Sequence, residues 1–156
     1  MSVPDTVQNF LRASEIPFSM VTHRPTKSSM ETAEAARVSG DRVAKAVVLE
    51  DGERYVMAVI PASHRLDHEA LCEILDTKVH LVGEEDFSLL FRDCRAGAVP
   101  PLGTAYGIHT VVDDAIAAQP DIYLECGDHE HLIHVDHDAF VRLMRTADHG
   151  RFSYHV

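Results

Sequence analysis

Two apolar runs of this sequence decide its fold: Val-Ala-Lys-Ala-Val-Val-Leu at 43–49 and Tyr-Val-Met-Ala-Val-Ile at 55–60. Both are rich in β-branched residues, which favour strands. Asp51-Gly52 lies between them, and both residue types tolerate the positive φ angles of a tight turn. The pattern therefore predicts an antiparallel β-hairpin that carries Lys45 in its first strand.

Helix-like and strand-like segments are interspersed outward from this hairpin. Helical spacing and capping residues predict helices at 5–15, 28–40, 67–75, 84–91 and 138–145. Apolar runs predict strands at 18–23, 79–82, 108–112, 122–125 and 131–135, while the segment after Ala147 is expected to be loose. The predicted fold class is therefore α/β, with a mixed, mainly antiparallel sheet covered by helices.

Composition bounds the broad class of protein. With 156 residues, 46% of them apolar and 25% charged, the chain fits one globular domain over 1–156. No run approaches the roughly 20 apolar residues of a membrane span, and no secretory leader is present, so we expect a soluble, cytoplasmic protein without a membrane partner. Three widely spaced cysteines suggest neither a disulfide framework nor a zinc knuckle.

Charge argues against a general nucleic-acid binder but leaves room for a local contact. The formal net charge is −11, whereas phosphate binding requires clustered Lys and Arg. Between residues 22 and 48, however, five cations outnumber three carboxylates. This excess is sufficient for a few phosphate contacts.

Lys45 is the first candidate for chemistry. Its apolar neighbours indicate a buried strand, where an unpaired ammonium is costly. It either reaches solvent or pairs with a carboxylate such as Glu31 or Glu34, or it binds an anionic or carbonyl-bearing ligand. Spacing alone leaves both interpretations open.

The segment Gly97-Ala98-Val99-Pro100-Pro101-Leu102-Gly103 is the second candidate. Its prolines lack amide hydrogens and its glycines allow unusual backbone angles, so it must be an irregular but restricted loop. It is either a rigid connection or a backbone wall that presents amides and carbonyls to a small ligand.

The third candidate is a histidine-rich segment at 129–137. His129, His131 and His134 raise the alternative of a metal-dependent hydrolase. No H-E-x-x-H helix or Cys pair accompanies them, which argues against a metal site. A Ser-His-Asp hydrolase is not favoured either, because no G-x-S-x-G elbow is present.

Several short motifs occur in a familiar order and spacing. They are His23, Thr-Ala-Glu-Ala-Ala at 32–36, the strand at 43–49, Ala-Ser-His-Arg-Leu-Asp at 62–67, the Gly-x-x-Pro-Pro-x-Gly loop and Val112-Asp113. In these motifs, from about Phe10 to Leu143, the chain resembles the YbaK and prolyl-tRNA synthetase-associated domain family of trans-editing aminoacyl-tRNA deacylases. The resemblance implies a YbaK-like, partly barrel-shaped sheet. It also implies hydrolysis of the ester between an amino acid and the terminal adenosine of a mischarged tRNA, which is a step of translation quality control.

The resemblance also implies partners and site residues. The partners are the 3′ end of aminoacyl-tRNA and, as a second candidate, an aminoacyl-tRNA synthetase; no metal or cofactor takes part. Lys45 corresponds to the lysine that the family requires for function. The residues expected to bind substrate are His23, Met30, Ala46, His64, Gly97, Ala98, Val99, Pro100, Pro101, Gly103, Gly127 and His129.

Two departures from the family pattern leave the amino-acid specificity open. Residues 125–129 read Glu-Cys-Gly-Asp-His where many members carry Ser-Gly or Gly-Gly, and Ala46 stands where some relatives have a polar residue. Met30 and Ala46 are expected to help set the size of the aminoacyl pocket. A non-catalytic module that binds charged tRNA or a synthetase is the alternative function.

Overall fold

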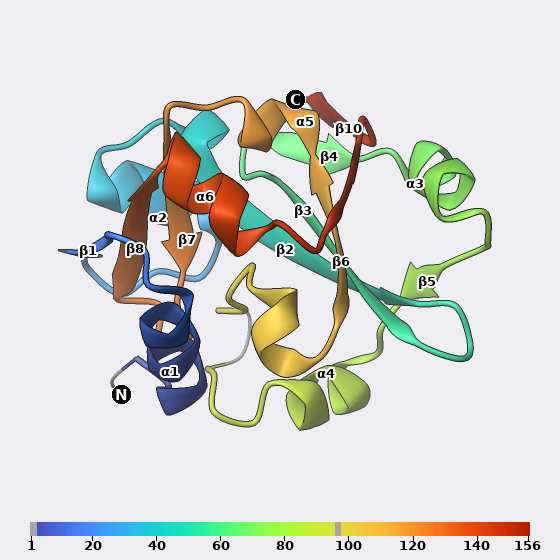
Figure 1. Ribbon diagram of the computed structural model, residues 1–156, viewed down its shortest axis with the longest axis horizontal. Helices are drawn as coiled ribbons and strands as arrows, with labels where there is room; N and C mark the ends of the chain where they lie inside the picture. Colours follow the sequence, from blue (N-terminus) through green and yellow to red (C-terminus); the bar gives the residue numbers. More distant parts are fainter. Residues whose placement is uncertain (1–2, 96–97) are drawn as a thin grey trace.

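The central element of the fold is the predicted hairpin. The structure, a computed structural model, describes residues 3–95 and 98–156. Strands β2 (Val43–Glu50) and β3 (Tyr55–Pro61) pair antiparallel in the middle of an eight-stranded sheet (Figure 1). The Asp51 carboxylate accepts the backbone amides of Glu53 and Arg54 at 2.9 Å each, which closes the turn.

The remaining strands extend the sheet on both sides of the hairpin. On one side, β7 (Asp121–Glu125) is parallel to β2, and β8 (His131–Asp136) and β1 (Ser19–Thr22) follow antiparallel. On the other side, β6 (His109–Asp113) and β9 (Asp148–Gly150) add in parallel. The short strand β5 (His80–Leu81) pairs with the end of β2, on the edge of β2 whose beginning pairs with β7. Four antiparallel and three parallel pairings confirm the predicted mixed, mainly antiparallel sheet.

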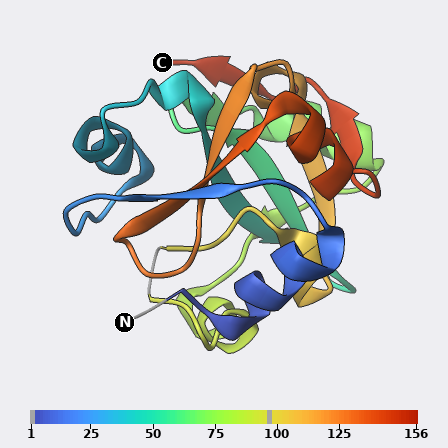
Figure 2. The same cartoon turned by 60° about the vertical axis from the view of Figure 1, so that its left-hand side comes forward.

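Helices cover both faces of this sheet. They are α1 (Asp5–Ser14), α2 (Ser29–Ala36), α3 (His68–Leu75), α4 (Glu84–Leu90), α5 (Asp114–Ala117) and α6 (His137–Leu143), with 3-10 turns at Gly40–Arg42 and Gly103–Tyr106. Figure 2 shows α2 on one side of the sheet and α1 and α6 on the other. No helix in the described ranges is both long and apolar enough to cross a bilayer.

The end of α2 differs from the prediction. The helix begins as expected, because the Ser28 hydroxyl accepts the Glu31 amide at 3.2 Å. It ends at Ala36 and not at Gly40, because Arg37 adopts a left-handed conformation with φ 59°. The Arg37 amide then bonds back to carbonyls of the last turn, a geometry that terminates a helix without glycine.

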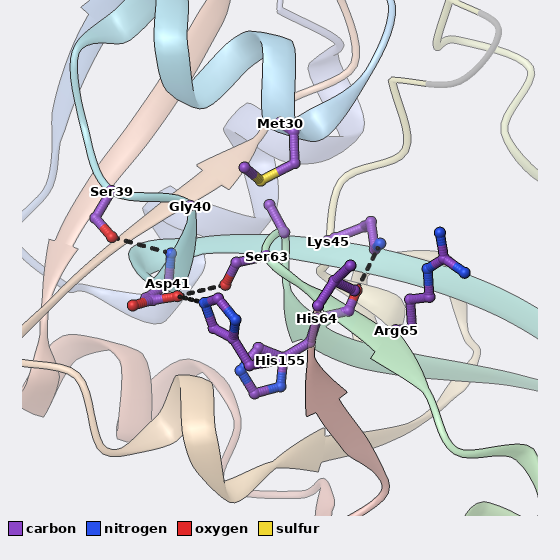
Figure 3. A pocket seen from close by; sticks show the side chains of 11 residues that line it. Met30, Ser39, Gly40, Asp41, Lys45, Ser63, His64, Arg65 and His155 are labelled. Carbon is purple, nitrogen blue, oxygen red and sulfur yellow. Dashed lines mark hydrogen bonds and ion pairs between the residues drawn. The ribbon is translucent and has the colours of Figure 1, made fainter.

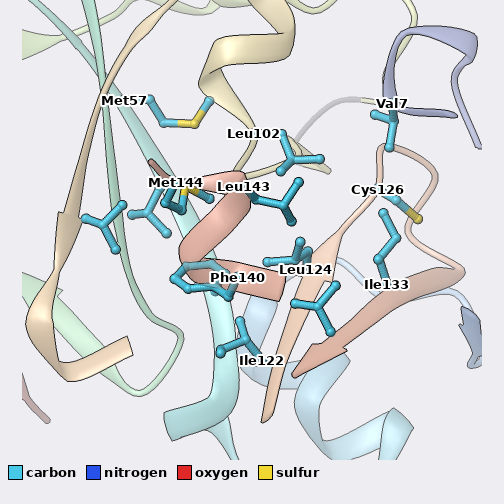
Figure 4. Packing of buried hydrophobic residues seen from close by; sticks show 14 of the residues in the cluster. Val7, Met57, Leu102, Ile122, Leu124, Cys126, Ile133, Phe140, Leu143 and Met144 are labelled. Atoms are coloured by element: carbon cyan, nitrogen blue, oxygen red, sulfur yellow. The ribbon is translucent and has the colours of Figure 1, made fainter. Parts of the chain in front are cut away.

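Side-chain alternation along β2 divides the interior into two faces. Ala44 and Val48 pack into the larger apolar cluster, which also contains Leu124, Ile133 and Phe140 (Figure 4). Residues at odd positions, Val43, Val47 and Leu49, belong to two smaller clusters on the opposite face. Because side chains of a strand alternate between faces, Lys45 projects with the odd-numbered residues, toward the side that α2 covers.

The C-terminal segment is part of the fold, so the expectation that it is loose was wrong. Strand β10 (Ser153–His155) pairs antiparallel with β4 (His64–Leu66). Phe152, 1% exposed, is buried in the cluster behind β3, and its amide donates to Asp113 Oδ2 at 2.9 Å. The strands are three residues long, which is too short for an alternation pattern to reveal them.

Replacing Phe152 tests whether this segment contributes to stability. Phe152→Ala should lower the free energy of unfolding by about 3 kcal/mol, because it leaves a cavity where the ring is buried. Tyr154→Ala is the matched control, since the Tyr154 side chain is 54% exposed and its loss should cost less than about 0.5 kcal/mol. Urea denaturation of both variants measures the difference; equal effects would contradict the placement of this segment.

Candidate functional site

Lys45 lines a cavity of about 550 Å³ between α2, the start of β2, β4 and β10 (Figure 3). Met30 projects toward it from α2, and His64 and Arg65 enter from β4. The lining residues are Met30, Ser39, Gly40, Asp41, Lys45, Ala62, Ser63, His64, Arg65, His155 and Val156. Three predicted site residues, Lys45, Met30 and His64, are therefore brought together.

The Lys45 ammonium is held by one backbone carbonyl. Its Nζ donates to the carbonyl oxygen of His64 at 3.1 Å. Burial, with a smaller effect from the nearby Arg65 cation, lowers the pKa of Lys45. Within the described part of the chain, no carboxylate lies within 4.0 Å of Nζ, and Glu31 pairs with Arg24 at 3.7 Å. Donor capacity at Nζ is therefore left for a ligand, since an ammonium carries three N–H groups.

A hydrogen-bonded chain fixes the His64 side chain. Ser153 Oγ donates to Asp113 Oδ2 at 2.9 Å and lies 2.9 Å from His64 Nδ1. Because the Ser153 proton goes to the carboxylate, its oxygen accepts from Nδ1, which leaves Nε2 as an acceptor in the neutral ring. Asp113, which belongs to a predicted motif, thus has a structural role, whereas no sequence motif pointed to Ser153.

A second polar group occupies the same cavity. Ser63 Oγ donates to the Asp41 carboxylate, and His155 Nε2 lies 3.2 Å from Asp41 Oδ1. The Ser63 hydrogen bond, aided by His155, holds the pKa of Asp41 below its usual value. Ser63 bonds to a carboxylate and not to a histidine, so it lacks the activating base of a serine hydrolase.

Glu125 is a buried carboxylate on the same face of the sheet as Lys45. Val43 pairs with Tyr123 and Ala44 with Leu124, so Lys45 and Glu125 are the next residues along two neighbouring parallel strands. Glu125 is 3% exposed, and burial raises its pKa to about 7, against the opposing influence of Thr32 and His129. Glu125 was not among the predicted site residues, although a carboxylate at the end of an apolar strand is visible in the sequence.

His23, Gly127 and His129 surround the outer end of this face. His23 is 7% exposed; its Nδ1 lies 2.7 Å from the Arg24 carbonyl, and its Nε2 has no partner among the described residues. Gly127 has φ 102°, and an added Cβ would lie 2.7 Å from Pro4 Cγ. His129 has φ 61°, which is uncommon outside glycine. The turn thus needs glycine at 127 and holds His129 in a restricted backbone conformation.

The proline loop lies on the other side of the sheet from Lys45. Ala98, Val99, Pro100, Pro101 and Gly103 are all buried. Val99 packs into the larger apolar cluster, and so does Ala46, which alternation places opposite to Lys45. No described residue of this loop lines the Lys45 cavity, and Gly97 lies outside the described residues.

Arg95, which precedes the proline loop in sequence, contacts the turn after β7. Its amide donates to the Gly127 carbonyl at 2.8 Å. At the end of the loop, an added Cβ on Gly103 would collide with Thr110 Oγ1, so this position requires glycine for close packing. The described loop residues therefore serve packing.

The histidine-rich segment does not converge on one point. Alternation along β8 places His131 and His134 on opposite faces. His131 Nδ1 bonds to Asp128, and His134 Nε2 lies 2.8 Å from Asp121 Oδ1. In the ranges that the structure describes, no group of three or more His, Cys, Asp or Glu side chains is arranged to hold a metal ion.

Comparison with protein families gives the matching region a name. The model of the aminoacyl-tRNA editing domain matches residues 23–143, a span that contains Lys45, His64 and Glu125. The chain belongs to the aminoacyl-tRNA editing domain family. The resemblance that the sequence motifs predicted is confirmed.

Solved structures share the fold of this editing domain. A proposed trans-editing enzyme for prolyl tRNA synthetase has a TM-score of 0.83 at 17% identity, covering 96% of this chain and 95% of that one. Hypothetical protein APE2540 also reaches 0.83, at 21% identity and with 96% and 100% covered. A proposed signal transduction protein from Marinobacter aquaeolei VT8 scores 0.79 at 20% identity, with 97% of this chain and 31% of that chain covered. No curated protein sequence matches the chain.

Glu125 makes the stability of the editing domain depend on pH. Its folded pKa of about 7 exceeds the ordinary 4.5, so between these values the folded protein binds more protons than the unfolded chain. Stability should therefore fall as pH rises from 4.5 to 7, by about 3 kcal/mol from this group. Glu125→Gln should remove this contribution, so that the variant gains on the wild type as pH rises. Parallel urea-denaturation profiles for the two proteins across this range would contradict the assignment.

Proposed function

We propose that this editing domain is a cytoplasmic aminoacyl-tRNA deacylase, acting in trans on the ester that joins an amino acid to the terminal adenosine of a mischarged tRNA. The observation that carries the proposal is the half-buried Lys45 ammonium, which faces a cavity and is held by a single backbone carbonyl. Lys45 is also the residue that matches the required lysine of the family.

The reaction needs little from the protein. An ester is already activated, so water attacks the carbonyl carbon, with a neighbouring hydroxyl of the substrate placed to assist it. The bond to the adenosine oxygen breaks, and that oxygen takes up the proton that the water loses. Lys45 donates either to the developing negative charge on the carbonyl oxygen or to the terminal phosphate.

Met30 is the proposed boundary for the amino-acid side chain. Its own side chain is 50% exposed and projects toward the cavity. An added Cβ on Gly40 would lie 2.6 Å from Met30 Sδ, so the glycine makes room for the thioether in this position. A flexible thioether at the mouth excludes large side chains more readily than small ones, which suits a second sieve for a small amino acid.

The charge of the cavity suits the phosphate at the end of a tRNA. Lys45 and Arg65 are cationic, whereas Asp41 is already bonded to Ser63 and His155. The rest of the molecule is acidic, with a net charge of −11. Binding should therefore be weak, involve few phosphates and depend on salt.

Lys45→Ala should lower kcat/KM for deacylation by at least about 100-fold, because it removes the charged donor at the reacting carbonyl or phosphate. Lys78→Ala removes an exposed lysine elsewhere and serves as the matched control. Single-turnover release of the amino acid from mischarged tRNA measures both, with thermal unfolding as the test of folding. A Lys45→Ala variant with the wild-type rate would disprove the role, and binding without hydrolysis by the wild type would favour the non-catalytic module.

Arg65→Ala should weaken tRNA binding and make it less dependent on salt. Loss of one phosphate contact to a single strand reduces the slope of log K against log salt by about 0.7. Arg92→Ala, which removes an exposed arginine after α4, should leave the slope unchanged. Fluorescence anisotropy with labelled tRNA at several salt concentrations measures the slopes, and an unchanged slope for Arg65→Ala would remove this residue from the phosphate site.

A further inference from the structure

The carboxylate of Glu125 is buried, and its environment in the described residues is only partly favourable. Only 3% of the residue is exposed, and no Lys or Arg in the described residues forms an ion pair with it. Its Oε2 is buried and has no hydrogen-bond partner among those residues. Thr32 and His129 favour its ionised form, whereas Asp128 acts as a like charge. A buried carboxylate oxygen without a partner is costly for a fold, which points to a ligand.

The position of Glu125 relates it directly to Lys45. The two residues follow the last paired residues of β2 and β7, Ala44 and Leu124, so they start from neighbouring strands and project from the same face. Neighbouring strands lie about 4.8 Å apart. Nevertheless, Lys45 and Glu125 do not form an ion pair within 4.0 Å. Lys45 and Glu125 therefore start from neighbouring strands without forming an ion pair with each other.

The helix above this face supports the same site. Thr32, which is 0% exposed, bonds to Thr26 at 2.5 Å and to the Ser28 carbonyl at 2.9 Å, so its hydroxyl is fixed beneath α2. Two residues earlier, Met30 reaches the Lys45 cavity. The same short helix thus contacts the surroundings of both charged groups.

The chemistry of an aminoacyl ester matches this pair of charges. Its α-ammonium group and its ester carbonyl are separated by a single carbon atom, so a site for the ester needs an anion beside its carbonyl-binding cation. We propose that Glu125 binds the α-ammonium group of the aminoacyl ester, an inference that rests on the proposed deacylase function. Lys45 then engages either the ester carbonyl, which is bonded to the same carbon atom, or the terminal phosphate. The two residues together select amino-acid esters over esters without the amine.

The binding of a cation also accounts for the state of the carboxylate. Burial favours its neutral form in the free protein, and an ammonium ligand favours the ionised form. The α-ammonium of the aminoacyl group therefore places a positive charge beside the Glu125 carboxylate. Glu125 touches the substrate amine and takes no part in breaking the ester bond.

The test compares two esters of one tRNA. One carries an amino acid, and the other carries the corresponding α-hydroxy acid, in which a hydroxyl group of similar size replaces the ammonium. Each rate is divided by the spontaneous hydrolysis rate of the same ester, because the ammonium itself activates the ester. The wild type should lose about 10- to 100-fold in kcat/KM on the hydroxy ester, since a charge-assisted contact disappears.

The Glu125→Gln variant completes the comparison. On the amino ester, its kcat/KM should fall below that of the wild type by a similar factor. On the hydroxy ester, its kcat/KM should be close to that of the wild type, because the contact with the ammonium is absent for both proteins. Glu130→Gln, in the same turn but partly exposed, should behave like the wild type on both esters. A merely structural role for Glu125 would slow both esters equally.

The possible outcomes distinguish failure of the proposed deacylase function from failure of the proposed role of Glu125. If the wild type hydrolyses no aminoacyl-tRNA, the proposed function fails. If it hydrolyses the amino and hydroxy esters with equal normalised efficiency, the deacylase function stands and the role of Glu125 is overturned. This comparison uses the wild type alone, so it holds even if Glu125→Gln fails to fold.

Discussion

The fold depends on the direction of one lysine side chain, which projects from an apolar strand in the middle of the sheet. Lys45 is flanked by Ala44 and Ala46, whose side chains face the larger apolar cluster. Its own side chain must take the opposite face, where the His64 carbonyl accepts its ammonium at 3.1 Å. For this hydrogen bond to form, His64 of β4 must lie next to the beginning of β2. Helix α2 covers the same face of the sheet and leaves a cavity beside Lys45.

Elements distant in sequence maintain this arrangement. Asp113, 2% exposed, accepts the Ala115 amide at 2.8 Å, the Phe152 amide and the Ser153 hydroxyl. It therefore ties the end of β6 to the C-terminal strand, and Ser153 in turn orients His64. Because charge-assisted hydrogen bonds to a buried carboxylate are strong and directional, the position of β4 depends on a residue outside the cavity.

The hairpin, the caps of α2 and α3, and most strands were predictable because their signals are local. Period-two alternation and capping residues report on neighbours along the chain. These signals made Lys45 a candidate, and the family resemblance singled it out. Strands β4 and β10 were not predictable, since three-residue strands depend on partners far away in sequence. The position of Glu125 next to Lys45 on a neighbouring strand depends on the register of β2 on β7, which the sequence does not show. Alternation along the strand implied that the side chains of Ala46 and Lys45 lie on opposite faces, although the family resemblance assigned both residues to one substrate site.

The charges of the site also explain how an acidic protein can meet an acidic nucleic acid. Asp41 is hydrogen-bonded to Ser63 and lies 3.2 Å from His155, whereas Lys45 and Arg65 are the two cations that line the cavity. Beyond a Debye length of about 8 Å at physiological salt, the remaining charges are largely screened. In the proposed function, a short single-stranded tRNA end enters this cavity, while the negative surface disfavours broad contact with the tRNA body. Recognition in this proposal is therefore limited to the terminal nucleotide and its amino acid, where an aminoacyl ester differs chemically from the rest of the molecule.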